Sequence, residues 1–139
     1  MAQPTGKPIV LAVDDASELL ALMAKALAAD YEVKTAADGT KALLAAAISP
    51  QPDVILLDVE MPGVSGFEVC KALKANPATA AIPVIFLTGK GESRDEMQGF
   101  ALGAVDYVTK PINAAVLKAR VRTHIALANQ REALEEMVR

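Results

Sequence analysis

Short apolar runs recur along the chain, with polar residues at their ends. Residues 8–13, 53–58 and 82–88 are rich in Val, Ile and Leu and do not alternate with polar side chains. Continuous runs of this length are typical of strands that are buried on both faces of a sheet. Residues 31–36 and 104–110 are weaker candidates of the same kind. The pattern therefore predicts five strands.

Segments with a helical spacing of apolar positions separate these runs. In the first of them Leu20, Met23 and Leu27 fall on one stripe, and Asn113 is a suitable N-cap for the last. The predicted helices are residues 17–29, 40–48, 65–75, 93–102 and 113–139. Strands that alternate with helices predict an α/β fold with a five-stranded parallel sheet and helices on both faces.

Composition narrows the classes of function. The chain has 139 residues, 53% hydrophobic and 22% charged, which is enough for one buried core. Its net charge is -3 and it has no run of Lys or Arg, so we expect no direct contact with nucleic acid. No apolar run reaches the roughly 20 residues of a membrane span. With a single cysteine, Cys70, the chain is expected to be cytoplasmic, away from membranes.

Polar residues with useful chemistry follow the predicted strands. They are Asp14 and Asp15 after the first strand, Asp58 after the third, Thr88 after the fourth and Lys110 after the fifth. Open parallel sheets bind ligands at the carboxyl ends of their strands. Three carboxylates brought together need a cation, and an all-oxygen cluster suits Mg²⁺. A hydroxyl and an ammonium on the same edge can hold the oxygens of a phosphoryl group.

Four motifs stand at these strand ends. They are Val13-Asp14-Asp15, residues 57–66, Leu87-Thr88-Gly89 and residues 103–111. Together they resemble the receiver domain of bacterial two-component response regulators, over roughly residues 7–127. The resemblance implies the flavodoxin-like strand order 2-1-3-4-5. It also implies a phosphorylatable signalling switch and not an enzyme.

The resemblance implies a role for each carboxylate. Asp58 would accept a phosphoryl group from a phosphohistidine on a sensor histidine kinase or a phosphotransfer protein. Asp15 and Asp58 would ligate Mg²⁺ directly and Asp14 through water, and the backbone carbonyl of Glu60 would supply a further ligand. Glu60 and Lys90 also flank the phosphoryl position, where their side chains can control the access of water.

The resemblance assigns the hydroxyl and the ammonium as well. Thr88 and Lys110 would contact the phosphoryl oxygens, and the peptide bond between Lys110 and Pro111 would be cis. When Thr88 moves toward the phosphoryl group, Tyr107 can rotate into the space that it leaves. Thr88 and Tyr107 would thus form a two-state switch that alters an output face.

The final predicted helix is longer than a domain of this size requires. We expect residues 1–127 to form the receiver domain, and residues 128–139 to be a helical extension that starts a linker to an output domain. The sequence of residues 120–125 is similar to that of receivers that precede cyclic-di-GMP enzymes or histidine kinases. A stand-alone receiver is the alternative. Leu127, Leu134 and Val138 form a short apolar seam, through which a homodimer could pair.

Three other interpretations of the acidic residues remain. Asp14 and Asp15 could simply cap the following helix. A phosphohydrolase of the haloacid-dehalogenase type also uses an aspartyl phosphate, but it has a second Asp where this chain has Glu60, and the length leaves no room for a cap domain. A flavodoxin-type module would need a phosphate-binding loop, and Asp14 and Asp15 would repel a phosphate there.

Overall fold

Five parallel strands form one sheet in the order β2-β1-β3-β4-β5. The computed structural model describes residues 6–89 and 93–138. The strands are β1 (Ile9–Val13), β2 (Glu32–Ala36), β3 (Val54–Asp58), β4 (Val84–Thr88) and β5 (Asp106–Thr109). Every residue of β1, β3 and β4 is buried, whereas the edge strands β2 and β5 are partly exposed. The predicted fold class and strand order are confirmed.

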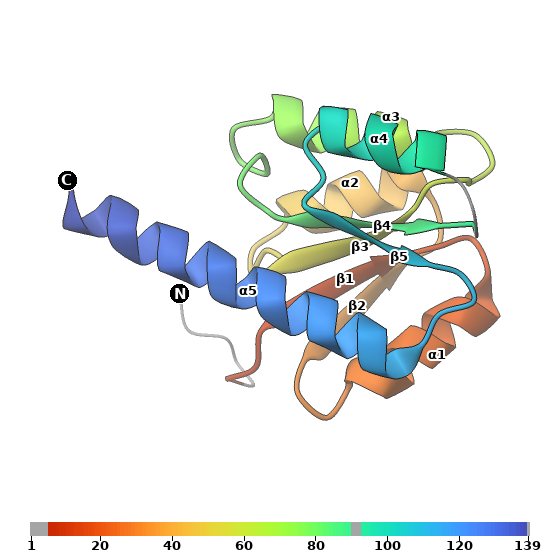
Figure 1. Cartoon of the computed structure of the whole chain (residues 1–139), viewed down its shortest axis with the longest axis horizontal. Coiled ribbons are helices and arrows are strands. Elements are labelled where there is room, and N and C mark those ends of the chain that lie inside the picture. Colours follow the sequence, from red (N-terminus) through yellow and green to blue (C-terminus); the bar gives the residue numbers. More distant parts are fainter. Residues whose placement is uncertain (1–5, 90–92, 139) are drawn as a thin grey trace.

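Helices cover both faces of the sheet (Figure 1). They are α1 (Ser17–Leu27), α2 (Gly39–Ala47), α3 (Gly66–Ala75), α4 (Ser93–Ala101) and α5 (Ala114–Met137). Successive residues of β1 face opposite sides, because Leu11 packs in the cluster with α2 and α3 while Val10 packs in the cluster with α1 and α5. Within the described residues, strands and helices begin and end within two residues of the predicted bounds.

Side chains at the helix ends account for several of these bounds. Asp38 accepts a hydrogen bond from the backbone N–H of Lys41 at the start of α2. Ser65 and Glu68 form a reciprocal capping box at the start of α3. The predicted cap of α5 is confirmed, since Asn113 accepts from the N–H of Val116.

The last helix runs without interruption to Met137 and projects beyond the sheet (Figure 1). Its first half is held by Leu117, Val121 and Ile125, which are buried. Further along, the Arg131 guanidinium donates to the backbone carbonyl of Ala81 at 2.9 Å. The helix is therefore attached to the loop between α3 and β4 beyond residue 127, and a domain boundary at that residue stays a prediction.

No helix within residues 6–89 and 93–138 combines the length and the apolar character that a bilayer crossing requires.

Candidate functional site

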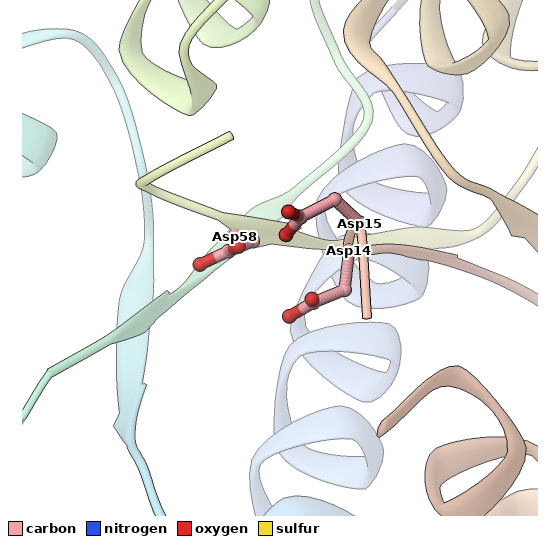
Figure 2. Close-up of side chains that lie close together, drawn as sticks. All are labelled: Asp14, Asp15 and Asp58. Atoms are coloured by element: carbon pink, nitrogen blue, oxygen red, sulfur yellow. The ribbon is translucent and has the colours of Figure 1, made fainter. Parts of the chain in front are cut away.

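Three carboxylates converge where β1 and β3 end, side by side in the sheet (Figure 2). Asp14 and Asp15 follow β1 directly, and Asp58 is the last residue of β3. One carboxylate oxygen from each lies within 4.8 Å of the others. Asp14 and Asp58 are buried and Asp15 is exposed, so the cluster opens to solvent on one side. Oxygen ligands with this spacing can share one hard cation.

The first acidic pair does not serve as a simple helix cap. Ala16 occupies the N-cap of α1, and it has no side-chain capping bond. One oxygen of Asp14, Oδ1, accepts from the N–H of Ala16 at 2.9 Å. Its other oxygen, Oδ2, faces the site, where Lys110 Nζ lies 3.1 Å away. Capping alone therefore does not account for these residues.

Lys110 joins two of the carboxylates across the sheet edge. Its Nζ lies 2.9 Å from Asp58 Oδ1 as well as 3.1 Å from Asp14 Oδ2. Burial lowers the pKa of this ammonium, but the hydrogen bonds to Asp58 and Asp14 outweigh burial and raise it. The ammonium thus stays charged and offsets part of the repulsion between the acids. The peptide bond between Lys110 and Pro111 is cis, as the sequence resemblance implied.

Burial also governs the ionisation of Asp58. Removal from water raises the pKa of its carboxyl to about 6, although the hydrogen bond from Lys110 and another from the Glu60 backbone act to lower it. Because the chain stabilises the charged form of this carboxylate only moderately, a bound cation would stabilise that form further. Among the described residues, the ammonium of Lys110 is the one that reaches this site of three carboxylates.

Thr88 places a hydroxyl at the same edge. It ends β4, next to β3 in the sheet, and is 1% exposed. Its Oγ1 has no hydrogen-bond partner among the groups that the structure describes, which leave out residues 90–92 and the side chains of residues 93–96. A buried hydroxyl without a partner costs about 1–3 kcal/mol. The hydroxyl is therefore available to bond an oxygen of a molecule that enters the site.

The turn between β3 and α3 lies against the backbone of Asp58. The Gly66 N–H donates to the Val59 carbonyl at 2.9 Å. A Cβ atom at Gly66 would lie only 2.0 Å from the backbone oxygen of Asp58. Only glycine allows α3 to begin this close to the end of β3. Lys90, which like Glu60 is predicted to flank the phosphoryl position, lies outside the described residues.

Tyr107 lies on β5 and contacts α4. Its ring meets Phe100 edge to face, with centroids 5.9 Å apart. Sequence reasoning missed this contact, because the single exposed aromatic of α4 carries no helical pattern by itself. It also missed the contacts of Asp106, whose Oδ2 lies 2.9 Å from His124 Nε2 and 3.5 Å from Arg120 Nε. The spacing of Arg120 and His124, one turn apart on α5, is the signal that could have indicated a shared partner.

Comparisons of sequence and fold relate the chain to known proteins. Residues 10–122 match the family described as the response regulator receiver domain. The chain is 47% identical over 136 residues to a probable cyclic di-GMP phosphodiesterase of Vibrio cholerae, covering 93% of this chain and 31% of that protein. It is 48% identical over 115 residues to the response regulator PleD of Caulobacter vibrioides, covering 82% and 25%. The chain thus spans a third or less of the length of these two curated relatives.

A solved structure shares the fold over nearly its whole length. The chemotaxis protein CheY4 of Vibrio cholerae superposes with a TM-score of 0.79 and 36% identity, over 84% of this chain and 98% of that one. Apart from Ile9, the first residue of β1, the family match covers all five strands, and it includes the three residues of the acidic cluster. The chain belongs to the response regulator receiver domain family.

Proposed function

We propose that the chain is the phosphoacceptor receiver of a two-component phosphorelay. Asp58 takes the phosphoryl group from a phosphohistidine on a sensor histidine kinase or phosphotransfer protein. An oxygen of Asp58 bonds to phosphorus as the phosphorus–nitrogen bond breaks, and the freed imidazole takes up a proton. The observation that carries the proposal is the meeting of three carboxylates, one ammonium and a buried hydroxyl without a described partner at one sheet edge.

The donor set fits Mg²⁺, because it offers oxygen atoms alone. Asp15 and Asp58 would hold the ion directly, Asp14 through water, and the Glu60 carbonyl would add a ligand. When bound, the ion offsets negative charge on the carboxylates and the phosphoryl oxygens. Lys110, which bridges Asp14 and Asp58, would then move its ammonium to a phosphoryl oxygen.

The same chemistry supports a switch from Thr88 to Tyr107. The Thr88 hydroxyl bonds a phosphoryl oxygen, and the movement leaves space beside β4. The Tyr107 ring then turns inward and gives up its edge-to-face contact with Phe100. The surface that α4, β5 and α5 share changes as a result, and a partner that prefers one form shifts the population.

We propose that the chain acts as a signalling switch and not as an enzyme on other substrates. Its catalysis is confined to its own phosphorylation and dephosphorylation, and its family membership favours this over the phosphohydrolase and flavin-binding alternatives. The proposal places the reaction in the cytoplasm, in keeping with the unpaired Cys70. The end of α5, from residue 128 on, is proposed to lead to an output domain, since the chain spans only 31% and 25% of two longer relatives.

Phosphoryl uptake should require Asp58 and a divalent cation. Incubation with acetyl phosphate and Mg²⁺ is expected to add one phosphoryl group, measured by intact mass. Asp58→Asn, or the wild type with excess EDTA, should show no addition. Asp53→Asn is the matched control, because this carboxylate lies at the opposite end of the same strand, where it accepts from the N–H of Ile9. Undiminished labelling of Asp58→Asn would contradict the assignment.

Replacing Lys110 with alanine should separate phosphoryl binding from the switch. The variant is expected to take up beryllofluoride with Mg²⁺ but to lose the accompanying change at Tyr107, because no ammonium links the bound group to β5. Tyrosine NMR signals in a Tyr31→Phe background report on Tyr107 alone. Lys118→Ala, an exposed position on α5, is the control. A Tyr107 response equal to that of the wild type would show that Lys110 does not couple beryllofluoride binding to the change at Tyr107.

A further inference from the structure

The second half of α5 separates two hollows of opposite charge. Both lie at the amino ends of the strands, on the opposite edge of the sheet from the acidic cluster. One hollow, of about 580 Å³, is lined by Lys74, His124 and Arg131 and by no carboxylate of the described residues; we name it the basic hollow. The other is lined by Asp53 and Glu132 and by no basic side chain of that same part of the chain.

Two cations share the basic hollow without an anion between them. Lys74 Nζ donates to the carbonyls of Ala80 at 3.0 Å and Ile82 at 2.7 Å. Arg131 Nη2 donates to the carbonyl between them, that of Ala81, at 2.9 Å. Burial lowers the pKa of Lys74, and the nearby Arg131 lowers it further. A carboxylate that entered this hollow would relieve the repulsion between the two charges.

The extension of α5 carries the complementary charge. We name residues 128–138 the extension; its charged side chains are Arg131 and three acids, Glu132, Glu135 and Glu136, all of them exposed. Glu135 follows Arg131 by one helical turn. Leu134, 63% exposed, lies between these two residues in sequence, near the same face.

Apolar positions continue from the hollow along the extension. Leu127 and Arg131 line the hollow, and Leu134 and Val138 continue the same face at spacings of three and four residues. Leu127, Leu134 and Val138 are 52%, 63% and 85% exposed. A helix that lies along this face would cover apolar surface and bring its own charges to the basic hollow.

We propose that the basic hollow receives the extension of a second copy of this chain, whose Glu135 carboxylate enters beside Arg131 and Lys74. A two-fold axis that crosses the extension near residue 133 lays the two helices antiparallel. Each Glu135 then faces the partner copy's hollow, and the Leu134 side chains meet near the axis. Because the contact is isologous, both hollows are filled at once and the assembly closes as a dimer. This association does not depend on the phosphoryl chemistry at Asp58.

Charge exchange between copies tests the proposal. Each of the variants Arg131→Glu and Glu135→Arg, taken alone, places like charges opposite each other. Each should weaken dimerisation at least about tenfold. Sedimentation equilibrium of the full chain over a wide concentration range measures the effect. An equimolar mixture of the two variants should regain the dimer, because both contacts between positions 131 and 135 in the mixed pair join unlike charges. Mixing does not restore the Arg131–Ala81 bond that Arg131→Glu removes, and it changes nothing within either chain. Recovery therefore reports a contact between copies.

Two further variants complete the test. Lys118→Glu makes the same change in net charge as Arg131→Glu, but at an exposed position in the first half of α5. This variant should dimerise as the wild type does. In a Cys70→Ala background, Val138→Cys should not form a disulfide dimer readily, because antiparallel helices hold the two positions apart. A wild type that is monomeric at every concentration, a mixture that does not recover, or ready cross-linking through Val138→Cys would each overturn the proposal.

Discussion

Gly66→Ala is expected to destabilise the protein by about 3 kcal/mol, at the upper end of the usual cost of overpacking. The new Cβ would lie 2.0 Å from the Asp58 carbonyl oxygen and 2.9 Å from the Val59 Cα. These atoms are backbone at the end of the buried strand β3, so they cannot turn away as a side chain can. Urea unfolding with chelator present measures the loss, and acetyl phosphate labelling should fall because Asp58 is displaced.

Gly63→Ala in the same turn is the matched control. Gly63 has φ of +78°, but a Cβ there would meet no atom within 4 Å. It should therefore cost only the strain of the left-handed backbone, about 1 kcal/mol. Equal losses of unfolding free energy in the two variants would show that the close approach of α3 to Asp58 is not what requires glycine at position 66.

Asp58→Asn is expected to stabilise the metal-free protein at neutral pH by about 1–3 kcal/mol. Burial raises the pKa of Asp58 from 3.8 to about 6, so the folded state holds this proton more tightly than the unfolded state does. Its contribution to stability is therefore complete below about pH 4 and is lost as the pH rises through 6. A difference of roughly two pKa units corresponds to about 3 kcal/mol at most.

The pH dependence distinguishes this cause from a general gain in stability. Urea unfolding from pH 4 to pH 8 with chelator should show the advantage of Asp58→Asn above pH 6 and its decline toward pH 4. Asp30→Asn, which removes an exposed carboxylate, should follow the wild type closely across the range. An advantage of Asp58→Asn that stays constant from pH 4 to pH 8 would mean that ionisation of a buried carboxyl is not its source.

Strand positions could be predicted from the sequence because strands that are buried on both faces consist almost entirely of apolar residues. The central strands β1, β3 and β4 are buried throughout and appear as continuous apolar runs. The edge strands β2 and β5 are half-exposed, and their pattern is correspondingly weak. Asp14, Asp58 and Thr88 could be placed at one edge because parallel strands align their carboxyl ends.

Contacts that depend on how a helix lies on the sheet could not be predicted. The bond from Arg131 to the Ala81 carbonyl requires the angle at which α5 crosses the loop before β4. The pairing of Asp106 with His124 depends on the same angle. Neither residue type nor spacing specifies this angle, because many small packing contacts determine it together.

The attachment of α5 by Arg131 gives the helix a defined direction for anything fused to it. The helix has no break between Ala114 and Met137. The receiver would therefore set the orientation, about the helix axis, of a reporter joined to its end. Inserting one residue would turn the reporter by about 100° and advance it by about 1.5 Å. Inserting seven would restore the original azimuth to within about 20°. In chimeras whose linkers differ by one residue at a time, the coupling between receiver and reporter should thus rise and fall with the helix period of about 3.6 residues.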